Sequence, residues 1–136
     1  MLKNTFHKQE RLYGKKAIDL LFEKGLSLSQ APIKLIYKAS LSTQVYPSKA
    51  MFVVPKKKFK HAHDRNLLKR RMREAYRLSK NGYYEKLNGK GVKVNCAFIF
   101  TQNQIADFDT IDKAIQTLLN QSVNKLKSPP QTKIID

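Results

Sequence analysis

The chain of 136 residues is 41% hydrophobic and 10% aromatic, which suits one ordinary domain with a modest core and argues against disorder along its whole length. Lysine and arginine number 27 against 10 acidic residues, and the resulting formal net charge of +17 predicts a polyanionic partner. The single cysteine, Cys96, excludes an intrachain disulfide scaffold, and the longest apolar run, 96–100, is too short to cross a membrane. Because residues 1–14 also lack the apolar stretch of a signal peptide, we expect a cytoplasmic protein with no membrane partner.

The first predicted elements are a loose basic segment and a short helix. Residues 1–14 are polar and basic and predict an N-terminal segment outside the domain. Over residues 15–24, apolar residues recur four apart, as Ile18 and Phe22 do, which places them on one stripe of a helix. Gly25 follows where a helix commonly ends.

Three strands are predicted next. Residues 26–29 indicate a brief edge strand, and residues 33–39 alternate between apolar and polar side chains, as a half-buried strand does. Residues 50–54 are rich in β-forming side chains and end at Pro55, which cannot donate a ladder hydrogen bond.

The second half predicts two helices on either side of a strand. A helix is expected from about Ala62 to Lys80, ending before Asn81-Gly82, and residues 92–101 are the most strand-like segment of the chain. A last helix, capped by Asp109 or Thr110, carries one apolar side: Ile111, Ile115, Leu118 and Leu119. The order of elements predicts an α+β sandwich in one domain, 15–126, followed by a flexible tail, 127–136.

One face of the expected 62–80 helix is a continuous cationic strip. At about 100° per residue, six polar side chains gather on one side and an apolar seam of Leu68, Met72 and Ala75 lies on the other, with Arg71 turned toward the seam. The strip consists of Arg65, Asn66, Lys69, Arg70, Arg73 and Arg77. Solvated helix faces usually mix both signs of charge, whereas this strip contains no acid and is rich in arginine, which favours bidentate phosphate contacts. We therefore predict a phosphate-binding helix, extended toward its N-terminus by the preceding lysines, 56–58.

The same stretch carries an ordered series of residues: Lys57-Lys58, Ala62, Arg65-Asn66, Lys69-Arg70, Arg73-Glu74 and Tyr76-Arg77. In order and spacing this series resembles the signature of the protein subunit of bacterial ribonuclease P, and the resemblance extends over about residues 10–126. It implies an αβββαβα sandwich of the ribosomal-protein-S5-domain-2-like kind. It also implies that the crossover through the basic helix is left-handed, an exception to the usual rule.

The resemblance further implies a role in tRNA processing. In that family a large catalytic RNA removes the 5′ leader from precursor tRNA, using Mg²⁺ held mainly by the RNA and the substrate, so neither catalytic residues nor an organic cofactor are expected in this chain. The implied contacts to the catalytic RNA are Lys57, Lys58, Arg65, Asn66, Lys69, Arg70, Arg73 and Arg77. The leader would lie in a cleft between the first helix and the sheet, where Phe22 and Tyr37 would stack on bases. No obligate protein partner is implied.

The sequence departs from the family pattern at three places. Leu67 stands where many members have a third basic residue, and Lys60-His61 replaces the common Gly-Asn before Ala62. Ile18 stands where an aromatic residue often lines the leader cleft.

Other interpretations of the residues remain open at this point. One is a ribosomal-protein-like RNA binder, and another is a protein-only nuclease with a two-metal centre at Asp107, Asp109 and Asp112. The position of these acids at a helix start favours capping instead. His61, His63 and Asp64 form a weak set of metal ligands, Cys96 is expected to be a buried small hydrophobic residue, and core packing is the alternative role for Phe22 and Tyr37.

Overall fold

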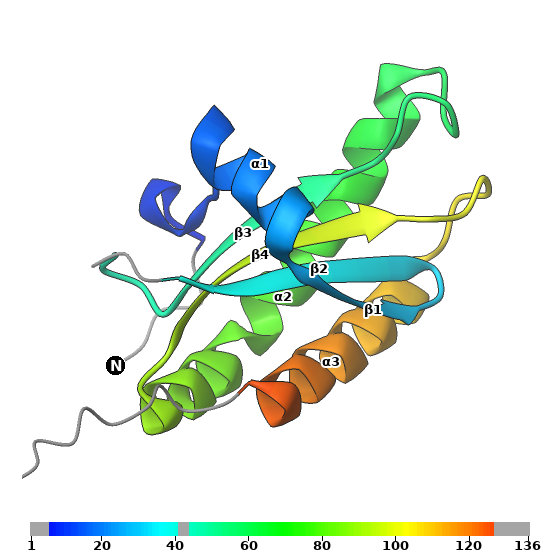
Figure 1. Cartoon of the computed structure of the whole chain (residues 1–136). Coiled ribbons are helices and arrows are strands. Elements are labelled where there is room, and N and C mark those ends of the chain that lie inside the picture. The colour runs from blue at the N-terminus through cyan, green and yellow to red at the C-terminus, as the bar shows by residue number, and fades with distance from the viewer. Residues whose placement is uncertain (1–5, 41–43, 127–136) are drawn as a thin grey trace, which may run out of the picture.

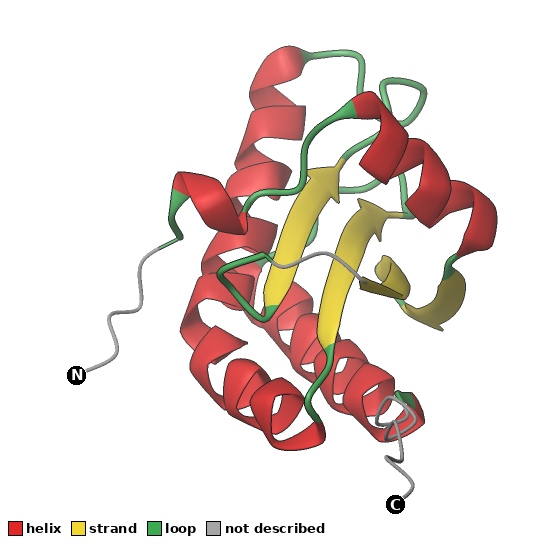
Figure 2. Ribbon diagram, turned by 60° about the vertical axis from the view of Figure 1, so that its left-hand side comes forward, coloured by secondary structure: helices red, strands yellow, loops and turns green. Residues whose placement is uncertain are grey.

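Four strands form one mixed sheet with helices on both of its faces. The computed structural model describes residues 6–40 and 44–126. In chain order its elements are the 3-10 turn η1 (Lys8–Glu10), α1 (Lys15–Lys24), β1 (Leu26–Gln30), β2 (Ile33–Ser40), β3 (Ser48–Val53), α2 (Ala62–Lys90), β4 (Lys93–Phe100) and α3 (Phe108–Lys125). The strands lie in the order β1-β2-β4-β3, and in this sheet β3 and β4 are the parallel pair. Figure 2 shows the strands between α1 on one side and α2 and α3 on the other.

The connection from β3 through α2 to β4 has the uncommon hand. In Figure 1 the chain leaves β3, runs back behind the sheet in α2 and returns in the adjacent, parallel strand β4. With the strands pointing upward and α2 behind them, β4 lies to the right of β3, so the crossover is left-handed, against the usual preference. The predicted α+β fold and its element order are confirmed.

The two faces of the sheet contribute to two separate cores. Because successive side chains of a strand point to opposite faces, Leu35 and Tyr37 of β2 pack with α2 and α3, whereas Ile36 packs with Leu21 of α1. Cys96 of β4 lies in the larger core, where burial raises the pKa of its thiol to about 12. The prediction that Cys96 is a buried small hydrophobic residue is confirmed.

α2 is longer than the sequence predicts, because it continues through Asn81-Gly82 to Lys90. Interior glycine costs a helix only about 1 kcal/mol relative to alanine, and burial of Tyr83 and Leu87 along the contact with α3 outweighs that cost. The helix ends instead at Gly91, whose φ of 68° lies in the left-handed region. Residues 88–90 therefore form the last turn of α2, and Gly91 is its cap.

The predicted boundaries elsewhere differ by a few residues at most. The short helix occupies the expected residues, 15–24, and the four strands lie where they were expected. The last helix starts earlier than predicted, since Asp107, in place of Asp109 or Thr110, is its cap and accepts a hydrogen bond from the Thr110 amide at 2.9 Å. Several residues at this position can cap a helix, and the sequence alone does not rank them.

The N-terminal segment is part of the packed domain from residue 6 onward, which corrects the prediction of a loose segment over 1–14. Glu10 is 0% exposed and Leu12 is 6% exposed. The Leu12 amide donates to the Ala50 carbonyl at 2.9 Å, so the segment lies along the outer edge of β3. Residues 1–5 and the predicted tail, 127–136, lie outside the described residues.

Candidate nucleic-acid interface

The first half of α2 has the cationic face that the sequence predicts. Asn66 and Arg70 are exposed, and Lys69 and Arg73 are half-buried beside them. The opposite face packs on the sheet through side chains that are 0% exposed: Leu68, Met72, Ala75 and Tyr76. Burial of this apolar face fixes the rotation of the helix about its axis, so the charged face is turned to solvent. The division of the helix into a cationic and an apolar face is confirmed.

The loop before α2 presents a second group of cations. Lys57 and Lys58 are exposed in a turn closed by a backbone hydrogen bond from the Lys58 amide. Nη1 of Arg65 donates to the carbonyl oxygens of Phe59 and Lys60 at 2.7 and 2.9 Å. Arg65 therefore holds this loop against the first turn of α2, and it acts as a positioning residue for the two lysines.

Arg77, at the far end of the strip, is paired with an acid. Its Nε and Nη2 donate to Oε1 and Oε2 of Glu74 at 3.0 and 2.5 Å. This hydrogen bonding holds the pKa of Glu74 below its usual value and raises the pKa of Arg77. Because a half-exposed pair of this kind contributes little to stability, Arg77 can exchange Glu74 for a phosphate. The net positive charge at Arg77 is nevertheless lower than at Arg70.

Arg71 has a structural role that the helical angles left open. Its Nη1 donates to the Ala106 carbonyl at 2.6 Å and so ties α2 to the loop that precedes α3. The long side chain carries its charge past the apolar seam to the surface.

A concavity between α2 and the N-terminal segment adds cations that the sequence analysis missed. Arg11, Lys69 and Arg73 line it together with apolar side chains that include Phe6 and Phe52. Burial lowers the pKa of Arg73, and the charge of Arg11 lowers it further. No local pattern signals this site, because Arg11 and Arg73 are distant in the sequence.

A second groove lies between α1 and the sheet. It has a volume of about 300 Å³ and is lined by Ala17, Leu20, Leu21, Lys38, Ala39, Ser40 and Asn95. The wall from α1 is apolar, and the floor from β2 and β4 is polar. Within the described residues, the buried Oδ1 of Asn95 has no hydrogen-bond partner. The groove therefore offers an apolar wall and an ammonium group to a ligand, whereas Oδ1 of Asn95 is closed off from solvent.

The two aromatic residues predicted for a cleft lie on opposite faces of the sheet. Phe22 is 44% exposed on α1, on the stripe that it shares with Ile18, and it does not line the groove. Tyr37 is 1% exposed and packs in the larger core beneath α2 and α3, so the prediction that it lines a cleft beside α1 is wrong. The alternation in β2 was read correctly, but the sequence does not show which face α1 covers. Burial raises the pKa of Tyr37.

The acids near the start of α3 have separate local partners. Asp107 caps the helix, Oδ2 of Asp109 pairs with Nζ of Lys113 at 3.1 Å, and Asp112 accepts from Gln116 at 2.9 Å. Among the residues that the structure describes, no three His, Cys, Asp or Glu side chains lie together as ligands for a metal ion. In the same part of the chain, no helix has the length and hydropathy needed to cross a membrane.

Comparison with known proteins identifies the family. A sequence model described as Ribonuclease P matches residues 6–123. A ribonuclease P protein component from Porphyromonas gingivalis (strain W83) is 33% identical over 112 residues, which cover 82% of each chain. The chain belongs to the ribonuclease P protein family. A protein component from Chlorobaculum tepidum is 42% identical over 81 residues, covering 57% of this chain and 53% of that protein.

Solved structures of the ribonuclease P protein family share this fold. The RNase P protein from Thermotoga maritima is 25% identical, with a TM-score of 0.64 over 82% of this chain and 96% of that one. The RNase P protein from Staphylococcus aureus has a TM-score of 0.67 at 17% identity and covers 83% of this chain and 94% of that one. Family membership confirms the resemblance seen in the basic stretch, and it favours a ribonuclease P protein over the ribosomal-protein-like alternative.

Proposed function

We propose that this chain is the protein component of a cytoplasmic ribonuclease P and that it binds both the catalytic RNA and the 5′ leader of precursor tRNA. One observation carries the proposal: in a chain of this family, the first half of α2 turns a cationic face outward while its opposite face is buried in the core. Arg70 is exposed on that face, and its guanidinium suits bidentate contact with a phosphate.

The catalytic RNA binds, in this proposal, along α2 and the loop before it. The proposed contacts are Lys57, Lys58, Arg65, Asn66, Lys69, Arg70, Arg73 and Arg77. Each lysine or arginine that reaches a phosphate releases counterions from the RNA, so affinity falls as the salt concentration rises. Arg65 contributes chiefly by holding the loop, and Arg77 must exchange Glu74 for a phosphate.

The leader lies, in this proposal, beside α1. The groove there offers an apolar wall from α1 and the ammonium group of Lys38, which can pair with a phosphate. Phe22 adds an exposed ring on the other side of α1. Stacking on a ring has little sequence preference, which suits a protein that accepts many different leaders.

The cleavage chemistry is assigned to the RNA. The acids at the start of α3 are directed to separate partners, so these residues do not fit a shared Mg²⁺ site, and we place the Mg²⁺ on the RNA and the substrate. The protein contributes positive charge where two polyanions meet. This charge lowers the repulsion between the catalytic RNA and precursor tRNA, and therefore the Mg²⁺ concentration that cleavage needs.

A reconstitution assay tests the proposal. Precursor tRNA is incubated with the catalytic RNA transcript alone, with the protein alone and with both, across a Mg²⁺ series. The protein alone is expected to cleave nothing, and its addition is expected to shift half-maximal cleavage to a lower Mg²⁺ concentration. Metal-dependent cleavage by the protein alone, or an unchanged Mg²⁺ requirement, contradicts the proposal.

Replacing Phe22 by alanine tests the leader side separately. Loss of a stacked base costs about 1–3 kcal/mol, so Phe22→Ala is expected to weaken binding of precursor tRNA by roughly five- to hundredfold while leaving mature tRNA unaffected. The measurement is a pair of dissociation constants for the reconstituted ribonucleoprotein. Leu78→Ala is the matched control, since Leu78 is 47% exposed on α2 against 44% for Phe22. Equal losses for both tRNAs point to damaged packing and not to stacking.

A further inference from the structure

The concavity between the N-terminal segment and α2 holds three cations without an acid. Arg11, Lys69 and Arg73 line it, and in residues 6–40 and 44–126 none of them lies within salt-bridge distance of a carboxylate. The two nearby acids form ion pairs elsewhere: Glu10 with Lys80 and Glu74 with Arg77.

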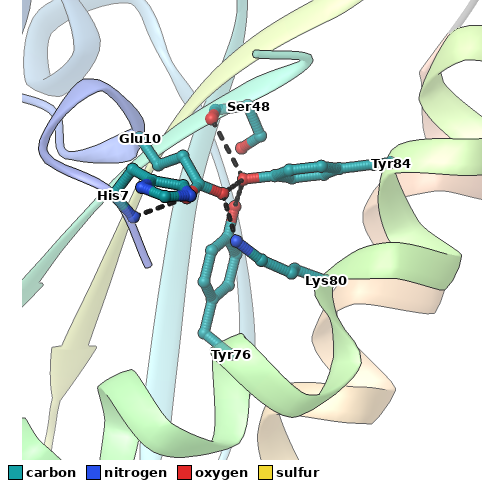
Figure 3. Close-up of polar contacts among 6 residues, drawn as sticks. All are labelled: His7, Glu10, Ser48, Tyr76, Lys80 and Tyr84. Carbon is teal, nitrogen blue, oxygen red and sulfur yellow. Dashed lines mark hydrogen bonds and ion pairs between the residues drawn. The ribbon is translucent and has the colours of Figure 1, made fainter. Parts of the chain in front are cut away.

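Arg11 is placed at this concavity by a buried polar cluster, shown in Figure 3. Oε1 of Glu10 accepts from Nζ of Lys80 at 2.5 Å and from the Tyr84 hydroxyl at 2.7 Å, and its Oε2 accepts from the His7 amide at 2.6 Å. Glu10 and Lys80 are 0% and 2% exposed. Since Arg11 directly follows Glu10 in the chain, the Glu10–Lys80 ion pair also fixes where the backbone of Arg11 lies beside α2.

Two further contacts fix the direction of the Arg11 side chain. The backbone of Arg11 pairs with Ala50 at the edge of β3, and its guanidinium carbon lies 5.6 Å from the centroid of the Phe6 ring. That ring packs edge-on against Phe52 and Tyr76, with 5.8 Å between centroids in both cases. Arg11 is thus held over a supported aromatic surface at the rim of the concavity.

This arrangement is unfavourable for the free protein. The charge of Arg11 lowers the pKa of Arg73, which means that the two cations repel each other across the concavity. The buried ion pair carries a desolvation cost of its own. An anion between the cations removes the repulsion, and a bound phosphate accepts hydrogen bonds from both guanidinium groups.

We propose that Arg11, Lys69 and Arg73 form a binding site for one backbone phosphate of RNA, and that the Glu10–Lys80 ion pair is the positioning device that holds Arg11 in this site. The site deepens the proposed function and rests on it, because it extends the RNA-binding face of α2 onto the N-terminal segment. The three side chains come from two separate parts of the chain, so the site exists only in the folded protein.

The test is the salt dependence of binding to polyuridylate RNA, measured with the full chain by fluorescence anisotropy across a KCl series. Arg11→Gln is expected to flatten the slope of log affinity against log salt by about 0.7, the value for one phosphate of a single strand. Arg11→Lys is expected to keep the slope, because it keeps the charge. Lys125→Gln, which removes an exposed charge at the end of α3, is the matched control and is expected to leave the slope unchanged.

Variants of Glu10 and Lys80 test whether their ion pair positions Arg11. Lys80 is buried and cannot reach RNA, yet Lys80→Met is expected to flatten the slope as much as Arg11→Gln, because unpaired Glu10 leaves its site and takes Arg11 with it. Combining the two changes is expected to flatten the slope no further, and Glu10→Gln/Lys80→Met is expected to restore it. If Lys80→Met does not fold, Arg11→Gln alone decides whether the phosphate site exists. Arg11 is exposed, so its replacement leaves the core intact.

The outcomes separate this proposal from the proposed function. A loss of slope in Arg70→Gln with none in Arg11→Gln overturns the N-terminal phosphate site and leaves RNA binding by α2 standing. No loss in either variant overturns both. A normal slope in folded Lys80→Met overturns the positioning role of the ion pair.

Discussion

Lys80→Met is expected to destabilise the folded chain by about 3–5 kcal/mol, because it leaves the Glu10 carboxylate buried without its countercharge. The Tyr84 hydroxyl and the His7 amide still donate to Glu10, but neither carries a charge. Replacing both partners, as in Glu10→Gln/Lys80→Met, is expected to recover most of the loss, since no ion is then left in the core.

Urea unfolding followed by circular dichroism measures this effect for the two single variants and the double variant. Lys86→Met is the matched control, because Lys86 lies on the same helix with an exposed side chain that reaches Asn120. A loss below about 1 kcal/mol for Lys80→Met, within the range of a surface pair, contradicts a buried ion pair that fastens the N-terminal segment.

Arg70→Gln/Arg73→Gln is expected to reduce affinity for the catalytic RNA by roughly a hundred- to ten-thousandfold, because charge-assisted hydrogen bonds contribute about 1.5–3 kcal/mol each and two are lost. If both side chains touch phosphates, the slope of log affinity against log salt falls by about two units. Filter binding of the labelled RNA transcript across a KCl series gives both quantities.

The control for this pair removes the same charge elsewhere. Lys113→Gln/Lys125→Gln acts on α3, where Lys113 is paired with Asp109. If this variant weakens binding as much as the arginine variant does, net charge and not the face of α2 governs RNA affinity. An unchanged slope in the arginine variant means that neither arginine reaches a phosphate.

The parts of the fold that local sequence patterns encode were predicted well. The spacing of Leu68, Met72 and Ala75 shows which side of α2 is buried, and therefore which side presents Arg70. The alternation in β2 correctly separates Ile36 from Leu35 and Tyr37. In these cases the pattern reflects the period of the helix or strand itself. It can therefore be recognised without knowing which element packs against it.

The parts that depend on distant contacts were missed. The pairing of Glu10 with Lys80 joins residues 70 positions apart, and no local pattern distinguishes this glutamate from a solvated one. The extension of α2 past Gly82 depends on packing against α3, and the burial of Tyr37 depends on which face of the sheet α1 covers. In each case tertiary contacts decide between local alternatives that the sequence leaves nearly equal.

Because β3 is an edge strand of the sheet, the N-terminal segment covers a backbone edge that would otherwise be open. An uncovered edge strand presents free amide and carbonyl groups that recruit strands from other molecules. Here the Leu12 amide donates a hydrogen bond to one such carbonyl, that of Ala50, and Arg11 places a positive charge beside it. Release of the segment therefore exposes a surface suited to intermolecular strand pairing, so self-association is the expected fate of chains that lose the Glu10–Lys80 pair before they meet RNA.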